Sequence, residues 1–301
     1  MGEKQCKVVP TQEFFTSGHR GCAGCGEMTA VRQVLLAAGE NSIVANATGC
    51  LEVASTAYPQ SAWNVPWIHV AFENAAAVAS GIDAALKATG KREGVNVFAF
   101  AGDGGTFDIG FQALSGMAER GQKVIYVVFD NEAYMNTGIQ RCSSTPYGAS
   151  TTTSPSGKYS IGENKKKKPI AHIMAAHDIP YVATATIAYH ADLKKKVKKA
   201  VKHGGPCFLH ILAPCPTGWR HGSDDTIAIA RLAVESGVFV LWEMEGGYDP
   251  DKLVITKKPK ERIPVVEYLK TQRRFRHLMD KPEELKKIQD EVDEKCAKYG
   301  F

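Results

Sequence analysis

The stretch Val95-Asn-Val-Phe-Ala-Phe-Ala-Gly-Asp-Gly-Gly105 decides the fold of this chain. Its first part, up to Ala101, is an almost unbroken apolar run, which is typical of a buried parallel strand. A Gly-Asp-Gly-Gly turn follows at once, and helical spacing of apolar residues begins near Phe107. Glycines at such a turn let a phosphate approach the backbone, and the free N–H groups of the helix start favour anions. We therefore predict a strand, a phosphate-binding turn and a helix in succession.

The same alternation of strand and helix extends over most of the chain. Further short apolar runs predict parallel strands at 42–45, 124–130, 181–187 and 207–212. Helical apolar spacing predicts helices at 28–38, 75–87, 107–119, 170–177 and 191–203. The pattern predicts an α/β fold with a doubly wound, mostly parallel sheet. Ligands bind such sheets beyond the carboxyl ends of the strands, so the expected site follows Ala45, Ala101, Asp130 and Leu212.

The composition is typical of a globular protein. Of the 301 residues, 44% are hydrophobic and 23% are charged, which suffices for a large core. The net charge of +5 is small, and we expect no nucleic-acid partner. The most apolar stretch, 227–242, is interrupted by Arg231 and Glu235, so no membrane span is predicted. The start of the chain does not resemble a secretory signal, and we predict a cytoplasmic protein with reduced thiols.

Two segments depart from the alternation of strand and helix. Residues 142–168 are rich in Ser, Thr, Gly and Lys without periodicity, and we predict a surface loop there. Beyond Glu243 the pattern loosens, apart from a polar helix expected at 282–298. We predict a main domain, 1–245, followed by a C-terminal arm, 246–301, that packs on the domain or on a partner.

Asp103 places a carboxylate where a phosphate is expected, and the two would repel each other without a cation between them. Mg²⁺ prefers oxygen ligands and shares them with phosphates. The next predicted strand ends at Asp130 and is followed by Asn131. The 26 residues at 105–130 suit a strand–helix–strand unit, which returns the chain to the carboxyl end of the neighbouring strand. We therefore expect the Asn131 side-chain oxygen to face Asp103 across one metal ion. A Gly-Asp-Gly turn alone would fit an ordinary glycine turn equally well.

Four of the eight cysteines fall in loops that are expected at one edge of the sheet. They are the CxxC pair Cys22 and Cys25, Cys50 after the first strand, and Cys215 after the strand at 207–212. Four thiolates there would bind zinc or an iron–sulfur cluster. Zinc ribbons normally use two close pairs, and only one pair exists here, which favours the cluster.

The remaining cysteines are weaker candidates. Cys207 is the alternative fourth ligand, but it starts an apolar strand, where a small buried thiol is the simpler interpretation. Cys6, Cys142 and Cys296 are expected to be free cysteines.

The Gly-Asp-Gly turn, with Asn131 one strand–helix–strand unit later, resembles the signature of thiamin-diphosphate enzymes. Together with the cysteines, it resembles the β subunit of the 2-oxoacid:ferredoxin oxidoreductases, most of all the multi-subunit pyruvate:ferredoxin oxidoreductases. The resemblance covers residues 15–245, and its blocks lie at 18–26, 48–52, 63–67, 72–76, 102–105, 136–138 and 213–216.

The resemblance implies oxidative decarboxylation of a 2-oxoacid, with pyruvate favoured, by thiamin diphosphate, Mg²⁺ and one [4Fe-4S] cluster bound in domain 1–245. Coenzyme A would take the acyl group and ferredoxin the electrons. The implied Mg²⁺ ligands are Asp103, Asn131 and the Ala133 carbonyl, and the implied cluster ligands are Cys22, Cys25, Cys50 and Cys215. Asn136 would be the catalytic residue near the thiamin C2 atom. The implied cofactor pocket also includes Glu27, Cys50, Leu51, Asn74, Gly102, Gly104, Gly105 and Thr137.

Thiamin-diphosphate sites lie between two domains, of which one grips the diphosphate and the other supplies a Glu to the aminopyrimidine ring. Only the diphosphate half is recognisable here, so we expect half an active site. By the resemblance, another subunit supplies that Glu, and a ferredoxin-like subunit carries further clusters.

Several alternatives stay open at this point. Glu27 also fits an acid that favours a helix start, and Asn136 a residue that forms a turn. Arg20, Arg141, Arg220 and His69 are substrate-carboxylate contacts or ordinary surface charges. The alternative functions are a relative that acts on a branched 2-oxoacid or oxalate, a non-redox thiamin-diphosphate decarboxylase with structural zinc, and a non-catalytic electron-transfer subunit.

Overall fold

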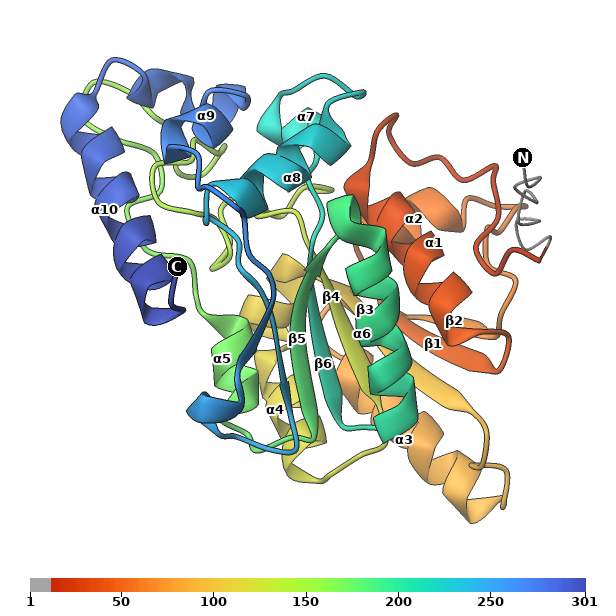
Figure 1. Ribbon diagram of the computed structural model, residues 1–301. Helices are drawn as coiled ribbons and strands as arrows, with labels where there is room; N and C mark the ends of the chain where they lie inside the picture. Colours follow the sequence, from red (N-terminus) through yellow and green to blue (C-terminus); the bar gives the residue numbers. More distant parts are fainter. Residues whose placement is uncertain (1–11) are drawn as a thin grey trace, which may run out of the picture.

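An eight-stranded sheet forms the centre of the computed structural model, which describes residues 12–301 (Figure 1). Its strand order is β2-β1-β3-β4-β6-β5-β7-β8. Strands β1 to β6 pair in parallel, whereas β7 runs antiparallel to β5 and β8 antiparallel to β7. The strands are β1 (Ser42–Ala47), β2 (Trp67–Val70), β3 (Asn96–Gly102), β4 (Ile125–Asp130), β5 (Tyr181–Thr186), β6 (Cys207–Leu212), β7 (Leu241–Glu245) and β8 (Val254–Lys257).

Helical layers cover both faces of the sheet. One layer contains α1 (Gly26–Ala38) and α6 (His190–His203), and the other contains α3 (Ala75–Ala88), α4 (Phe111–Glu119) and α5 (Ile170–Ala175). The remaining helices are α2 (Cys50–Ser55), α7 (Pro216–Trp219), α8 (Thr226–Glu235), α9 (Val265–Leu269) and α10 (Pro282–Lys298). Short 3₁₀ segments lie at Ile187–Tyr189, Pro250–Lys252 and Arg273–Leu278.

Strand β3 shows how the sheet forms two cores. Phe98 and Phe100 pack into the core on the α1 and α6 side, while Val97 and Ala99 pack into the core on the α3 and α4 side. Successive side chains of a strand point to opposite faces, so a strand covered on both faces must be apolar throughout. The predicted doubly wound, mostly parallel fold is therefore confirmed.

The sequence patterns missed the helices α2, α7, α8 and α9, the strands β2, β7 and β8, and the first turn of the helix after β3. β2 is a four-residue edge strand with two exposed side chains, so it has no apolar run to recognise. The helix predicted from Phe107 begins earlier, as a π-helical turn over Gly104–Ile109, before α4. In this turn the Gly110 N–H donates to the Gly105 carbonyl at 2.8 Å. Such turns are frequent at functional sites.

The prediction of a surface loop at 142–168 is wrong for the first part of that segment. Ser144 and Thr145 are fully buried although both are polar. The Ser144 hydroxyl donates to the Asp130 carboxylate at 2.5 Å, and the Thr145 hydroxyl to the Glu132 carbonyl at 2.9 Å. Buried polar groups are tolerated where they are hydrogen-bonded, and here they satisfy acceptors at the end of β4.

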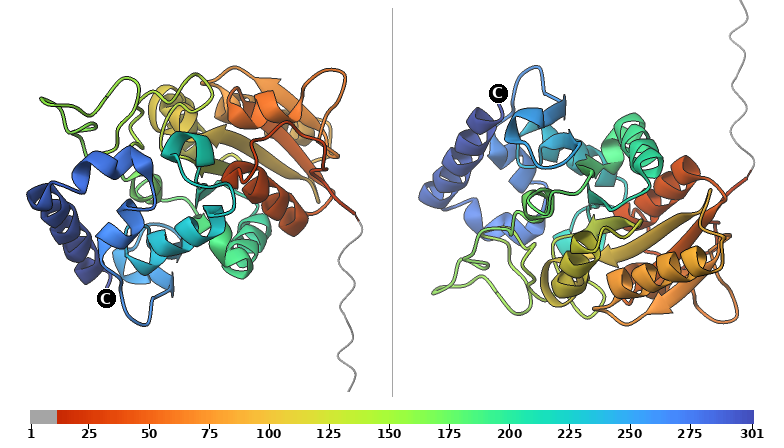
Figure 2. Two further views of the ribbon diagram at one scale, coloured as in Figure 1. Left: turned by 90° about the horizontal axis from the view of Figure 1, so that it is seen from above. Right: turned by 90° about the horizontal axis from the view of Figure 1, so that it is seen from below.

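The C-terminal residues build a third core around Trp219, Tyr268 and Phe275, and α10 lies at its outer side. Figure 2 shows α10 at the opposite end of the molecule from α1 and β1. The helix predicted at 282–298 agrees with α10. The division after residue 245 stays a prediction, and it falls between the paired strands β7 and β8. Among residues 12–301, no helix has the length and apolar character to cross a bilayer.

Candidate functional site

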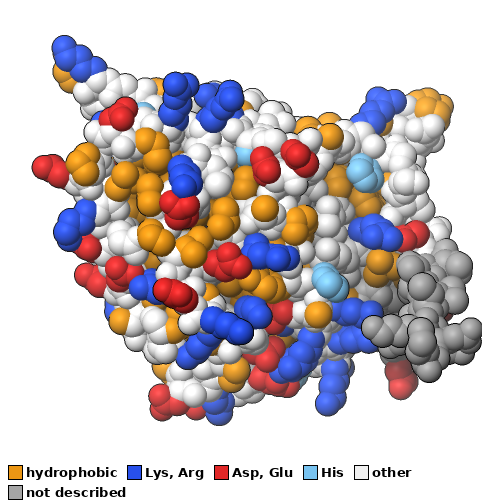
Figure 3. Space-filling model, turned by 45° about the horizontal axis from the view of Figure 1, so that its top comes forward, with side chains coloured by type: hydrophobic (Ala, Val, Ile, Leu, Met, Phe, Trp, Pro, Cys, Tyr) orange, Lys and Arg blue, Asp and Glu red, His pale blue; other side chains and the backbone are white. Residues whose placement is uncertain are grey.

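A cavity of about 330 Å³ opens at the carboxyl edge of the sheet, beyond the ends of β1, β3 and β4. This is the edge at which ligands bind in doubly wound sheets. The side of the molecule that is turned forward in Figure 3 mixes hydrophobic side chains with both signs of charge. Glu27 and Phe72 line part of the cavity. The other lining residues lie at or just after the carboxyl ends of the three strands, and they are Thr48, Gly49, Cys50, Gly102, Asp103, Gly104, Asn131, Ala133, Tyr134, Met135, Asn136 and Thr137.

Asp103 joins the ends of β3 and β4. Its side chain is 2% exposed, and its two carboxylate oxygens accept the Gly104 N–H at 2.6 Å and the Ala133 N–H at 2.9 Å. Burial, together with the negative charge of Asp130, raises the pKa of Asp103 well above its ordinary value. A divalent cation would reverse this effect, because it stabilises the carboxylate.

Asn131 presents the second ligand group expected for such a cation. The side chain is buried, and its Oδ1 atom has no hydrogen-bond partner. Its backbone is fixed, since the Asn131 carbonyl accepts the Trp219 indole N–H at 2.7 Å. An unpaired amide oxygen in the same cavity as a carboxylate is the kind of ligand that Mg²⁺ prefers. Asp103 and Asn131 therefore fit a magnesium ion, and Ala133 lines the same cavity.

The turn between β3 and α4 is closely packed at its first two residues, Gly104 and Gly105. A Cβ atom on Gly104 would lie 2.0 Å from the Tyr134 ring, and one on Gly105 would lie 3.0 Å from the Phe72 carbonyl. The Tyr134 hydroxyl in turn donates to Asp108 at 2.8 Å. Gly104 is required because the chain after β4 packs directly on it, and Gly105 lies close to the chain after β2.

A second cavity, of about 410 Å³, adjoins the first one. Glu27, Cys50, Asn131 and Asn136 line both cavities. The thiol-bearing residues of its wall are the four predicted ones, Cys22, Cys25, Cys50 and Cys215. The structure therefore brings the three predicted cysteine loops to one place.

The loops that carry these cysteines touch one another. The Gly26 N–H donates to the Pro214 carbonyl at 3.2 Å, and the Thr217 hydroxyl lies 3.8 Å from the Cys22 sulfur. Across residues 12–301, no three His, Cys, Asp or Glu side chains converge as a metal site. The four thiols thus surround the cavity without forming a closed coordination shell.

The remaining cysteines lie elsewhere. Cys207 is buried at the amino end of β6, with its sulfur 3.6 Å from the Ala200 carbonyl, at the opposite edge of the sheet from the cavity. Cys142 and Cys296 are buried free thiols, and Cys6 falls outside the described residues.

Burial favours the protonated form of three of the cavity thiols, because it raises the pKa values of Cys25, Cys50 and Cys215. It raises the pKa of Cys25 to about 12, with a further contribution from the negative charge of Glu27. The pKa of Cys50 is raised for the same two reasons. Thiolates at these positions require a positively charged partner, and a bound metal ion is one.

Glu27 lies in the first turn of α1 and is almost completely buried. Its Oε2 atom has no hydrogen-bond partner. Burial alone raises the pKa of Glu27 to about 8. An acid whose role was to stabilise the helix start would act as a charged carboxylate, and exposure to water favours that charged form. Glu27 is instead buried and lines both cavities.

The other predicted site residues divide into two groups. Asn136 and Thr137 line the first cavity, and Asn136 also lines the second. Leu51, Asn74 and Gly105 are not among the residues that line either cavity, and their role stays a prediction.

Two of the four candidate substrate contacts are engaged by other groups. Arg141 pairs with Glu163 at 2.7 Å, and His69 contacts the Thr48 hydroxyl at 2.6 Å. Arg220 is exposed, and Arg20 is the one of the four that lines the cysteine cavity.

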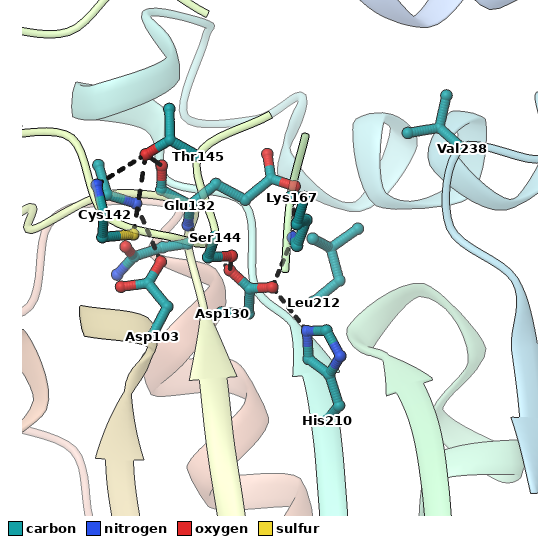
Figure 4. A network of polar contacts seen from close by, with 12 residues as sticks. Asp103, Asp130, Glu132, Cys142, Ser144, Thr145, Lys167, His210, Leu212 and Val238 are labelled. Carbon is teal, nitrogen blue, oxygen red and sulfur yellow. Dashed lines mark hydrogen bonds and ion pairs between the residues drawn. The ribbon is translucent and has the colours of Figure 1, made fainter. Parts of the chain in front are cut away.

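Sequence reasoning missed a group of charged residues behind the Asn131 turn. Figure 4 shows Asp130 at the end of β4, between His210 of β6 and Lys167 of the long loop. His210 Nε2 donates to the Asp130 carboxylate at 2.6 Å, and Lys167 Nζ lies 2.6 Å from it. A run of lysines predicts an exposed face, so no local signal marked Lys167.

The raised pKa of Glu27 predicts how stability changes with pH. The unfolded chain releases this proton near the ordinary value of 4.5, but the folded protein holds it up to about 8. Folding stability therefore falls as the pH rises through this window. Glu27→Gln should remove the effect and stabilise the cofactor-free protein by on the order of a few kcal/mol at about pH 8, and much less at about pH 5.

Urea denaturation at both pH values measures this difference. Glu283→Gln is the matched control, because Glu283 is an exposed acid in the first turn of α10. An equal effect of Glu27→Gln at both pH values would contradict the raised pKa.

Comparisons with known proteins show the family to which the chain belongs. Residues 47–211 match the family described as thiamine pyrophosphate enzyme, C-terminal TPP binding domain. The chain is 56% identical over 298 residues to pyruvate synthase subunit PorB of Methanocaldococcus jannaschii, covering 97% of this chain and 98% of that one. It is 48% identical over 279 residues to ketoisovalerate oxidoreductase subunit VorB of Pyrococcus abyssi, covering 91% and 89%.

A solved structure shares the fold. The 2-oxoglutarate:ferredoxin oxidoreductase from Magnetococcus marinus superposes with a TM-score of 0.57 at 21% identity, over 72% of this chain and 79% of that chain. The chain therefore belongs to the thiamine pyrophosphate enzymes and, within them, to the β subunits of the multi-subunit 2-oxoacid:ferredoxin oxidoreductases.

Proposed function

We propose that this chain is the cofactor-binding subunit of a pyruvate:ferredoxin oxidoreductase that holds thiamin diphosphate, Mg²⁺ and a [4Fe-4S] cluster side by side. The observation that carries the proposal is the pair of adjoining cavities, one lined by Asp103 and Asn131 and the other by four cysteines. The substrate follows from the high identity to relatives named pyruvate synthase subunits.

Thiamin diphosphate, when bound, supplies the nucleophilic carbon that decarboxylates a 2-oxoacid. The Asp103 carboxylate, the Asn131 amide oxygen and the Ala133 carbonyl would hold Mg²⁺ against the diphosphate. Glu27 would hold a proton at Oε2 within the first cavity, where its raised pKa keeps it protonated near neutral pH. Asn136 would contact the reacting end of the cofactor, because it lines both cavities.

Cys22, Cys25, Cys50 and Cys215 would hold the cluster. Cys50 supports this arrangement, because it lies on the wall that the two cavities share. A cluster held by these cysteines would supply one-electron redox chemistry next to the first cavity, in a reaction that delivers electrons to ferredoxin and the acyl group to coenzyme A. We expect this reaction in the cytoplasm, where thiols remain reduced.

The chain would work as half of an active site. The matching family model describes only the cofactor-binding domain of the thiamine pyrophosphate enzymes, and the described fold contains one such sheet. Another subunit would supply the Glu that faces the aminopyrimidine ring, and a ferredoxin-like subunit would carry further clusters.

A branched 2-oxoacid is the second candidate substrate. The favouring observation is the 48% identity to subunits named ketoisovalerate oxidoreductase. The two substrates differ in the size of the alkyl group, and assays with pyruvate, a branched 2-oxoacid and oxalate distinguish the candidates.

The metal content and visible spectrum of the complex, purified without oxygen, test the proposal. We expect about four irons for the cysteine site of this chain, beyond those of its partners. Adding the 2-oxoacid with coenzyme A should bleach the visible absorbance. Zinc in place of iron, with no bleaching, would instead indicate a non-redox thiamin-diphosphate enzyme.

Two cysteine variants test the fourth cluster ligand. Cys215→Ser should lower the iron content and the visible absorbance of the complex, because one ligand thiol is lost. Cys207→Ser, at the amino end of β6, is the matched control and should keep both. Iron assays on the two purified complexes measure the difference. Iron lost from Cys207→Ser but retained in Cys215→Ser would exclude Cys215 as the ligand.

A further inference from the structure

The backbone turns sharply at Glu132, between the two residues that present ligand groups to the cation. Glu132 has a φ of +70°, in the left-handed region that non-glycine residues rarely adopt. Its neighbours are Asn131, with the unpaired side-chain oxygen, and Ala133, whose N–H donates to Asp103. The turn at Glu132 therefore sets the direction of both. A strained backbone of this kind persists only where the surroundings hold it.

The carboxylate, the backbone carbonyl and the backbone N–H of Glu132 all have polar partners. One carboxylate oxygen lies 2.7 Å from Lys167 Nζ, and the other accepts from Arg274 at 2.5 Å. The backbone carbonyl accepts the Thr145 hydroxyl at 2.9 Å, and the N–H donates to the Asp130 carboxylate at 3.1 Å.

The residue on the other side of Asn131 is held by the same lysine. Lys167 Nζ lies 2.6 Å from the Asp130 carboxylate, which is fully buried (Figure 4). Burial alone would raise the pKa of Asp130, but the charge of Lys167 and the hydrogen bond from His210 outweigh it and lower this pKa. One ammonium group therefore connects the carboxylates that precede and follow Asn131.

Arg274 fixes the turn from the opposite side. Its guanidinium lies 3.9 Å from the centre of the Trp219 ring, and the Trp219 indole N–H donates to the Asn131 carbonyl. Lys167 comes from the long loop and Arg274 from the 3₁₀ segment before α10, so two distant segments converge on this turn. Neither residue lines the cofactor cavity.

The charges in this group balance. Two buried carboxylates, of Asp130 and Glu132, face two cations, of Lys167 and Arg274. Removing one member of a buried pair leaves the other charge without a partner, which is strongly unfavourable. The network thus stabilises one particular arrangement of the turn.

We propose that Lys167 and Arg274 are positioning residues, which hold the turn at 130–133 in the shape that presents Asn131 and Ala133 to the magnesium ion of the cofactor. This inference rests on the proposed function. It assigns a role to the lysine run at 165–168, of which only Lys167 reaches both carboxylates.

Binding of thiamin diphosphate to the cofactor-free complex, titrated with Mg²⁺ and followed by tryptophan fluorescence, tests the proposal. Lys167→Met should raise the Mg²⁺ concentration at half-saturation by about 10- to 100-fold, the usual cost of losing a partner behind a metal ligand. At saturating Mg²⁺ and cofactor, kcat should stay near that of the wild type. Lys167→Arg should restore most of the affinity, because it keeps the charge. Lys166→Met is the matched control, since Lys166 is exposed and pairs with Glu291, at 3.3 Å, rather than with Asp130 or Glu132.

A second pair of variants separates positioning from general stability. Glu132→Ala and Glu132→Gly both remove the carboxylate, but only glycine adopts a positive φ without strain. We expect the alanine variant to need more Mg²⁺ than the glycine variant. The comparison of the two Glu132 variants still tests the proposal if the complex with Lys167→Met does not assemble.

The possible failures are distinct. If Lys167→Met lowers the melting temperature but needs no more Mg²⁺ than Lys166→Met, the residue is merely structural and the inference is overturned. Equal Mg²⁺ requirements in the two Glu132 variants would overturn it as well. Wild-type binding of thiamin diphosphate that is independent of Mg²⁺ would overturn the proposed cofactor site and, with it, this inference.

Discussion

The contact on which the site depends is the pair of hydrogen bonds that Asp103 accepts from Gly104 and Ala133. These bonds join the ends of two neighbouring parallel strands through one buried carboxylate. A buried carboxylate is costly unless it is paired or hydrogen-bonded, so the surrounding chain must provide such partners. The turns after β3 and β4 consequently pack so closely that Gly104 has no room for a side chain.

Much of this arrangement follows from the sequence, because it depends on local patterns and on the rules of parallel sheets. β4 and β6 are buried along their whole length and therefore appear as continuous apolar runs. A strand–helix–strand unit returns the chain to the same sheet edge, which places Asn131 beside Asp103. The same rule brings the loops of Cys50 and Cys215 together with the CxxC loop. The edge strands β2 and β8 are short and partly exposed, so they lack such a pattern.

The charged network behind the turn could not be predicted in this way. Glu132 meets Lys167 at a separation of 35 residues and Arg274 at a separation of 142 residues. Neither pairing repeats with the period of a helix or a strand, and a run of four lysines normally lies in water. Only the folded chain shows that the third of these lysines turns inward, toward the two buried carboxylates of Asp130 and Glu132.

The wall between the two cavities couples whatever binds in one of them to whatever binds in the other. Glu27, Cys50, Asn131 and Asn136 face both spaces, so an occupant of one space changes the surroundings of the other. Linkage of this kind is reciprocal, because whatever the first occupant does to the affinity for the second, the second does to the first. The total free energy of filling both spaces is therefore the same whichever space is filled first.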